Sequence, residues 1–206
     1  MNSILLLGGG GHAGACIDVL KTQGEWEVAG IIERDGFQGP SSLGYPVFGT
    51  DSEIDQLVSR GTPVLNAIGQ LTSPSARKNA YELATASGAV FPLIQSPHAY
   101  VSSTASLGLG TVVMHGAIVN AQSRVGIQCI INSRALIEHD SVIGDFCHIS
   151  TGALINGGVA IERGTFIGSG AIVREGIHIG ENAVVGAGAR VMRDLPAGSV
   201  LKGPTP

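Results

Sequence analysis

A histidine and an aspartate stand side by side in the segment EHD, as His139 and Asp140. A histidine has an ordinary pKa of about 6.5, so it is the side chain best suited to act as a general base near neutral pH. A carboxylate beside it stabilises the imidazolium that forms. Since neighbouring residues of a flat strand point to opposite faces, Asp140 reaches His139 only where the chain bends. A corner of the fold would supply that bend.

A second segment suited to chemistry is the glycine-rich turn GGGGHAG, which begins at Gly8 directly after the apolar run ILLL. Gly9, Gly11 and Gly14 satisfy the spacing G-x-G-x-x-G of dinucleotide-binding turns, a pattern that is weak by itself. Such a turn can present backbone N–H groups and a helix N-terminus to a diphosphate. The alternative is that these glycines only allow a strand and a helix to pack closely.

The elements that must position these residues differ between the two halves of the chain. Every sixth residue from Val101 to Val191 is Val, Ile or Leu, and the position four residues after each is mostly small. An amphipathic helix has a period of about 3.6 residues, so this pattern excludes one. It is typical of a parallel β-solenoid, in which three short strands form each triangular coil. The aliphatic residue fills the interior, and the small residue lets the chain turn the corner.

The first 95 residues alternate between two kinds of pattern. Apolar runs predict strands at residues 3–8, 26–33, 63–69 and 89–94. Helical patterns cover residues 13–23, 51–60 (with Asp51 or Ser52 as the cap) and 74–87, and residues 34–46 read as a turn-rich loop. Alternating strands and helices indicate a parallel sheet. The predicted domains are therefore an α/β Rossmann-like domain at residues 1–95 and a parallel β-helix at residues 96–206.

The size of the first domain bears on the ligand of the glycine turn. A complete dinucleotide fold has two halves and six strands, with the cofactor in the crevice between them. About four strands precede the solenoid here, so only one mononucleotide half is present. A nucleotide-sugar is therefore a better candidate ligand than NAD.

Composition excludes several other classes. The net charge of -4 gives no basic patch for nucleic acid, and the three cysteines lack metal-ligand spacing and suit a reducing compartment. No stretch approaches the about 18 apolar residues that span a bilayer, and the amino terminus does not resemble a signal peptide. We expect a cytoplasmic protein without metal or membrane insertion. A zinc hydratase on the same solenoid needs three converging histidines, two of them close in sequence, and that short pair is missing.

The domain order, with GGGGHAG in the first domain and IINSRALIEHDSVIGDFCHISTGALING in the second, resembles the hexapeptide-repeat acyltransferases. The resemblance covers nearly the whole chain and implies a left-handed β-helix. It points to the branch that contains N-acetyltransferases of UDP-4-amino-sugars in bacillosamine-type pathways, GDP-perosamine N-acetyltransferases and sialic acid O-acetyltransferases. It implies acetyl-CoA-dependent N-acetylation of a nucleotide-linked amino-sugar, of the UDP-4-amino-4,6-dideoxy type, for bacterial glycan biosynthesis. O-acetylation of sialic acid or another sugar stays open.

The resemblance also implies roles for residues. His139 is the implied general base, Asp140 raises its basicity, and His148 contacts acetyl-CoA. Further acetyl-CoA contacts are implied at Ser169 and Ala187. The nucleotide-sugar contacts are implied at six residues: Gly10, Gly11, His12, Glu33, Arg34 and Gly69.

Three further expectations complete the site. The backbone N–H groups of Asn156, Gly157 and Gly158 are candidate donors to acetyl-CoA, where a tetrahedral oxyanion needs them. The chain has Glu33-Arg34-Asp35 where the family often has Asp-Asp, which leaves uridine or guanosine open. The family forms homotrimers with acetyl-CoA between neighbouring β-helices, so we expect a homotrimer.

A sugar nucleotidyltransferase needs a much larger first domain, and the intact EHD segment argues against a non-catalytic scaffold.

Overall fold

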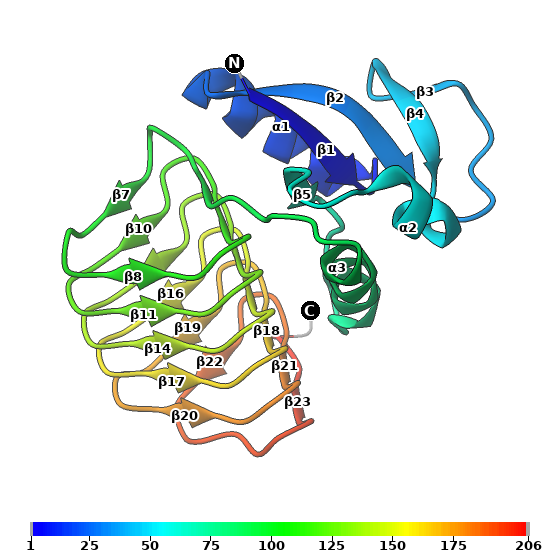
Figure 1. Cartoon of the computed structure of the whole chain (residues 1–206). Helices are drawn as coiled ribbons and strands as arrows, with labels where there is room; N and C mark the ends of the chain where they lie inside the picture. The colour runs from blue at the N-terminus through cyan, green and yellow to red at the C-terminus, as the bar shows by residue number, and fades with distance from the viewer. Residues whose placement is uncertain (1, 205–206) are drawn as a thin grey trace. The chain divides into compact units, whose positions relative to one another are not determined.

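The computed structural model describes residues 2–204, which form two compact units (Figure 1). The first unit runs up to Gly69 and continues through Ser75–Pro92. The second comprises the short segment Gln70–Pro74 and the chain from Leu93 onward.

The first unit is a small α/β fold with a five-stranded sheet of order β3-β4-β2-β1-β5. Strands β4, β2, β1 and β5 run parallel, and β3 pairs antiparallel with β4. The sheet strands are β1 (Asn2–Leu7), β2 (Trp26–Glu33), β3 (Ser41–Ser42), β4 (Tyr45–Thr50) and β5 (Val64–Asn66). The helices are α1 (Gly11–Gln23), the 3-10 helix η1 (Asp51–Glu53), α2 (Ile54–Leu57) and α3 (Ser75–Ala86).

Two predictions for this unit are wrong in detail. The fourth parallel strand is β4, in a region where residues 34–46 were expected to be a loop. Pro46 and Gly49 interrupt the apolar pattern of β4, and this obscures a strand in the sequence. The expected helix at residues 51–60 is only η1 followed by the single turn α2. Its N-cap is Thr50, whose N–H donates to the Glu53 carboxylate at 2.9 Å, and not Asp51 or Ser52.

The apolar run at residues 89–94 is divided between the two units. Val90 forms an isolated parallel bridge with Pro63, whereas β6 (Ile94–Gln95) pairs with β9 (Val112–Val113) of the second unit. Pro92 lies between them and has no N–H to continue the pairing. The units therefore meet in sequence between Pro92 and Leu93, not between residues 95 and 96 as expected.

The second unit is a parallel β-helix with three sheets, which we name by the order in which each coil visits them. Face 1 holds β7 (Tyr100–Val101), β10 (Ile118–Val119), β13 (Leu136–Ile137), β16 (Leu154–Ile155), β19 (Ile172–Val173) and β22 (Arg190–Val191). Face 2 holds β8 (Ser106–Leu107), β11 (Arg124–Val125), β14 (Val142–Ile143), β17 (Ala160–Ile161) and β20 (His178–Ile179). Face 3 holds β6, β9, β12 (Ile130–Ile131), β15 (His148–Ile149), β18 (Phe166–Ile167), β21 (Val184–Val185) and β23 (Val200–Leu201).

The second residue of almost every strand points into the coil, and the six-residue pattern is thereby confirmed. Ile137, Ile155 and Val173 stack directly above one another on face 1, each with 0% of its surface exposed. The aliphatic residues of all three faces form one continuous core. The first residue of each strand points outward, so each face presents a column of side chains with one residue per coil.

The small residues at the corners have a second function besides allowing the turn. Ser123 Oγ donates to the Glu138 carbonyl at 2.8 Å, and Ser141 Oγ donates to the Asn156 carbonyl at 3.0 Å. Four more buried donors follow the same spacing of 15 residues: Thr111 to Gly126, Cys129 to Gly144, Cys147 to Glu162 and Thr165 to Gly180. An unpaired buried carbonyl is costly, so these hydroxyls and thiols satisfy the corners from inside.

The inward and outward residues of one strand offer a matched test of this core. We expect Ile143→Ala, which truncates a side chain that is 2% exposed, to lower the free energy of unfolding by about 2–5 kcal/mol. Val142→Ala, on the outer side of the same strand, should cost about 1 kcal/mol or less. Urea unfolding followed by circular dichroism measures both. Equal losses for the two variants would contradict the assigned directions.

Candidate active site

His139 and Asp140 lie on the corner between β13 of face 1 and β14 of face 2. Asp140 has φ of 60°, in the left-handed region that turns the chain sharply. Its Oδ2 atom lies 2.8 Å from Nδ1 of His139. The chain thus bends where a contact between these two neighbours requires it, and the contact is direct. The two side chains are 63% and 57% exposed, so the pair is open to a ligand.

The hydrogen bond that His139 donates to Asp140 is the largest effect on the pKa of His139 and raises it; burial lowers this pKa, and the charges of Asp140 and Glu138 raise it further. A carboxylate only accepts hydrogen bonds, so Nδ1 of His139 carries the proton of this bond. Nε2 is then the ring atom with a lone pair. The geometry supplies an oriented base whose basicity is increased by its neighbour.

Gly157 lies directly beside this imidazole. A Cβ atom on Gly157 would be 2.7 Å from Cε1 and 2.8 Å from Nε2 of His139, so only glycine leaves room for the ring. The N–H of Gly158 donates to the His139 carbonyl at 2.9 Å, and the N–H of Asn156 donates to Val173 at 3.2 Å. The N–H groups of two of the three expected oxyanion donors thus already donate within the β-helix. Of the three, only Gly157 remains as a candidate oxyanion donor.

His148 lies on β15 of face 3 and is only 6% exposed. Its Nδ1 is 2.7 Å from the carbonyl oxygen of Gln70, and its Nε2 is 3.0 Å from Nδ2 of Asn132. A carbonyl accepts only, so Nδ1 donates to Gln70, and Nε2 accepts from the amide of Asn132. The Phe166 ring packs edge-on at 5.2 Å between ring centroids. His148 is therefore a fixed ring in its neutral form.

The residues around His148 could not all be found from the sequence. Gln70 belongs to the segment Gln70–Pro74, and its side-chain Nε2 donates to the Gly164 carbonyl at 3.2 Å. No local pattern links Gln70 to a histidine 78 residues later. Asn132 could have been found from the sequence, because the coil period places it on the corner immediately above that of Ser150.

One chain does not bring all the expected acetyl-CoA residues together. His139 is on the corner between faces 1 and 2, which in a triangular coil is opposite face 3, where His148 lies. Ser169 and Ala187 are exposed on the corner between faces 3 and 1, where Ser169 Oγ is 3.0 Å from Ser150 Oγ. The expected contacts are thus divided among two corners and one face of the β-helix.

The glycine turn contains glycines of two kinds. A Cβ on Gly9 would be 2.0 Å from Oε1 of Glu33, and one on Gly8 would be 2.8 Å from the Ile68 side chain. Close packing therefore explains Gly8 and Gly9. A Cβ on Gly10 or Gly11 would meet nothing within 4 Å. At these two positions the absence of a side chain leaves open space in front of the helix.

That open space faces the N-terminus of α1, a helix of 13 residues. Gly10 is its N-cap, without a side-chain cap, and its first turn contains no acidic residue. The first N–H groups of such a helix, together with its dipole, attract anions. This end of α1 is suited to a phosphate group.

The other predicted nucleotide-sugar residues gather at the same edge of the sheet. Glu33 ends β2, is 6% exposed and accepts the Arg34 N–H at 3.3 Å, while the Arg34 side chain is exposed. Gly69 follows β5, and a Cβ there would be 3.4 Å from Cβ of His12. β2 and β5 flank β1 on opposite sides, and ligands of open α/β sheets bind at such a switch point. Ser42 of β3, whose Oγ also faces Gly9, is not among the residues predicted from the sequence for this site.

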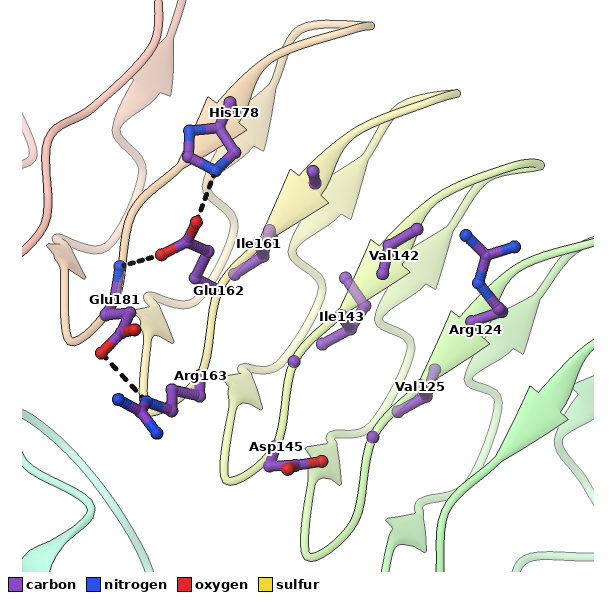
Figure 2. A pocket seen from close by; sticks show the side chains of 13 residues that line it. Arg124, Val125, Val142, Ile143, Asp145, Ile161, Glu162, Arg163, His178 and Glu181 are labelled. Atoms are coloured by element: carbon purple, nitrogen blue, oxygen red, sulfur yellow. Dashed lines mark hydrogen bonds and ion pairs between the residues drawn. The ribbon is translucent and has the colours of Figure 1, made fainter.

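A hollow of about 670 Å³ on face 2 contains none of the predicted site residues (Figure 2). Within it, His178 Nε2 lies 2.9 Å from Glu162, and Arg163 Nε donates to Glu181 at 2.9 Å (Figure 2). Its charged side chains thus largely pair with one another. Among residues 2–204 no group of three His, Cys, Asp or Glu side chains is placed to hold a metal ion, and no helix is long and apolar enough to cross a membrane.

Comparisons with known proteins extend over both units. Residues 3–83 match the PglD N-terminal domain family, and residues 158–193 match the hexapeptide repeat of succinyl-transferase. The chain has no significant match among curated protein sequences.

Solved structures are similar to the chain over almost its full length. PerB from Caulobacter crescentus, solved with CoA and GDP-perosamine, is 35% identical, with a TM-score of 0.87 over 97% of this chain and 93% of PerB. The acetyltransferase domain of PglB from Neisseria gonorrhoeae is 31% identical, with a TM-score of 0.87 over 97% of this chain and 96% of that domain. WeeI from Acinetobacter baumannii, at 24% identity and a TM-score of 0.86 over 98% of this chain and 97% of WeeI, shares the fold. The chain belongs to the hexapeptide-repeat sugar N-acetyltransferases, which join a Rossmann-like domain to a left-handed β-helix.

Proposed function

We propose that this protein transfers the acetyl group of acetyl-CoA to the amine of a nucleotide-linked 4-amino-sugar. The observation that carries the proposal is the His139–Asp140 pair, an oriented and exposed base on the β-helix. Similarity to PerB, whose structure contains CoA and GDP-perosamine, supports the choice of donor and acceptor. UDP- and GDP-linked 4-amino-4,6-dideoxy sugars are the candidate acceptors. We assign the reaction to the cytoplasm, which suits three free cysteines.

The proposed reaction balances as follows. The neutral amine attacks the thioester carbonyl carbon, and a C–N bond forms while Nε2 of His139 takes a proton from the nitrogen. The resulting imidazolium is stabilised by Asp140, which accepts from Nδ1 at 2.8 Å. The negative charge on the carbonyl oxygen is stabilised by the N–H of Gly157. The C–S bond then breaks, and the sulfur of CoA leaves with the proton that the imidazolium returns.

The glycine turn supplies the acceptor site in this proposal. The N–H groups at the start of α1 bind the diphosphate, and the open space at Gly10 and Gly11 lets the phosphates approach the backbone. Glu33 and Arg34, at the end of β2, contact the nucleoside, as the acidic residue of this strand does in related folds. His12 and Gly69 complete the site. Only one mononucleotide half is present, so the nicotinamide part of NAD has no crevice.

Face 1 supports assembly into a homotrimer. Its outward column is apolar from Tyr100 through Leu154, with exposed fractions of 58% at Tyr100, 39% at Ile118 and 36% at Leu154. The outward columns of the other faces differ: face 2 carries Arg124 and His178, and much of face 3 is already buried. An exposed apolar face marks an interaction surface. We infer that three chains turn face 1 toward a common axis.

This arrangement completes the divided active site. Face 1 is bounded by the corner that carries His139 and by the corner that carries Ser169 and Ala187. When face 1 of each chain turns toward the axis, the first corner of one chain lies beside the second corner of its neighbour. His139 of one subunit then works on acetyl-CoA held at the Ser169 corner of the next, with His148 lining the same neighbour's side. The homotrimer and this shared site are proposals.

The base is tested first. We expect His139→Ala to lower turnover by about 10²–10⁴-fold, the usual contribution of general acid–base catalysis, with the fold intact. His178 is another exposed histidine, and it lies on face 2 away from the corner of His139. His178→Ala is therefore the matched control and should keep full activity. Thiol release from acetyl-CoA is measured with a panel of amino-sugar nucleotides and with sialic acids. A His139→Ala protein with near-normal turnover would contradict the role.

Asp140→Asn tests the same pair through pH. Activity requires the neutral imidazole, so kcat/KM rises as pH rises through the pKa of His139. Asp140 raises that pKa, so its removal should move the acidic limb of the profile to lower pH and reduce the maximal rate by less than His139→Ala does. An unshifted acidic limb counts against the assigned tuning.

The glycine turn is tested by Gly11→Val. A Cβ added there meets no atom within 4 Å outside its chain neighbours and its own helical turn, so the side chain should block phosphates without disturbing the fold. Calorimetry should show UDP or GDP binding to the wild type, no binding of NAD, and loss of the nucleotide in the variant while acetyl-CoA still binds. Gly14→Val, one turn along α1 and equally free of contacts, is the control. Tight NAD binding, or a loss of acetyl-CoA alone, would overturn this assignment.

Assembly is tested on face 1. Light scattering should give the wild type three times the 21.0 kDa mass of the chain. Leu154→Glu places a charge in the apolar column and should yield inactive monomers that remain folded. Ala160→Glu, on the outer side of face 2 in the same coil, should stay trimeric and active. A fully active monomeric wild type would rule out the shared site.

A further inference from the structure

Arg77, the third residue of α3, is fully buried, with 1% of its surface exposed. An arginine is almost never buried to this extent unless hydrogen bonds satisfy it. Its Nη1 donates to the carbonyl of Ile68, and also to that of Asn66 at 3.4 Å. In return, the side-chain amide of Asn66 donates to the Arg77 carbonyl at 2.9 Å. One guanidinium thus ties the end of β5 and the turn after it to the start of α3.

The bond to Ile68 fixes the direction of the peptide group that joins Ile68 to Gly69. Among residues 2–204 there is no cis peptide bond, and a trans peptide group points its C=O and its N–H to opposite sides. The Ile68 carbonyl points inward to Arg77, so the N–H of Gly69 points away from it. Gly69 is exposed, and its N–H has no acceptor in the described part of the chain. This N–H is therefore a fixed donor that is open to a ligand.

The donor lies beside the glycine turn. A Cβ on Gly8 would be 2.8 Å from Cγ1 of Ile68, and one on Gly69 would be 3.4 Å from Cβ of His12 in the first turn of α1. The turn after β5 therefore packs against the turn after β1. The N–H of Gly69 joins the N–H groups at the start of α1, at the edge of the sheet where ligands of such folds bind.

The guanidinium also brings a positive charge to this edge. Arginine keeps its proton in proteins, and a charge acts more strongly in the interior than in water. Burial raises the pKa of the Cys16 thiol in α1 to about 12, and the charge of Arg77 lowers it, so this charge is felt at the helix. A guanidinium bonded to the Ile68 carbonyl also polarises the peptide group and makes the Gly69 N–H a stronger donor. Both effects favour an anionic ligand.

We propose that Arg77 is a positioning residue of the acceptor site, which aims and polarises the Gly69 N–H for a phosphate of a nucleoside diphosphate. Arg77 itself does not touch the ligand. The inference rests on the proposed function for its choice of ligand, and it goes beyond that function by giving a role to a buried residue behind the site. A clamp with a structural role alone would affect the binding of a nucleoside and of its diphosphate equally.

Calorimetry with UDP or GDP and with the matching nucleoside tests the role. Arg77→Met keeps an unbranched side chain and removes the charge. It should weaken binding of the diphosphate about tenfold, as expected for the loss of a charged hydrogen bond, and that of the nucleoside about twofold or less. In turnover it should raise KM for the acceptor and leave kcat near the wild-type value. Arg77→Lys keeps the charge and should recover part of the affinity for the diphosphate.

Lys78→Met is the matched control. It removes a cation from the next position of α3, where Lys78 is exposed and pairs with Glu82 at 3.7 Å. Binding of the diphosphate by this variant should equal that of the wild type. Thermal unfolding of each variant shows whether it is folded.

The wild type provides a second test that needs no folded variant of Arg77. In protein labelled with ¹⁵N-glycine, the amide signal of Gly69 is identified by its loss in Gly69→Ala. The amide proton should shift downfield with UDP or GDP and stay in place with the nucleoside. Equal shifts with both ligands, or no shift with either, would overturn the inference.

The outcomes separate the two proposals. Arg77→Met with wild-type affinity for the diphosphate overturns the inference and leaves the proposed function standing, as does an equal loss of affinity for nucleoside and diphosphate. A wild type that binds the diphosphate as described but acetylates no amino-sugar sinks the proposed function and keeps the role of Arg77. A wild type that binds no nucleoside diphosphate overturns both.

Discussion

The hydrogen bonds between successive coils are the constraint on which the second unit depends. Up to the last coil each strand pairs with the strand 18 residues later, as Leu136 does with Leu154, and this register repeats along all three faces. In the last coil the spacing falls to 16 residues, as between Val184 and Val200. The corners obey the same rule, because Gly158 binds the carbonyl of His139. A side chain on the β-helix is consequently placed by its position within the coil. A slip of one residue would move the aliphatic column outward and the whole site with it.

This regularity explains how a short corner can hold a reactive pair. The backbone around His139 is bonded on both sides, to the coil above through Asp140 and Ala121 and to the coil below through Gly158. Asp140 can therefore keep its left-handed conformation, which a non-glycine residue adopts only when its surroundings enforce it. The imidazole is oriented by one carboxylate and kept in place beside Gly157. The rigid scaffold thus carries an exposed base that does not depend on a buried pocket of its own.

The three faces of the β-helix differ in their outward residues. Face 3 buries part of its outward column, including His148, which the segment Gln70–Pro74 contacts through the Gln70 carbonyl. Face 2 carries paired charges, and face 1 leaves an apolar column exposed. Chemistry is concentrated at the corners, where the backbone turns outward and side chains are not part of a sheet. The active site that we propose, assembled from corners of two chains, is consistent with this plan, because a single triangular coil cannot bring opposite corners and faces together.

Much of this protein follows from its sequence by itself. The strict period from Val101 to Val191 determined the β-helix, and the adjacency of His139 and Asp140 in EHD allowed the contact that the structure shows. These predictions succeed because they depend on repeated or adjacent residues, for which local spacing determines contact.

Tertiary structure alone decided the rest. It divided residues 89–94 between the units, made β4 the fourth parallel strand and placed the Gln70 carbonyl on His148. It also buried His148 and used the N–H groups of Asn156 and Gly158 within the β-helix. Such contacts join residues far apart in the chain, and their energy comes from packing and hydrogen bonding that no local pattern records.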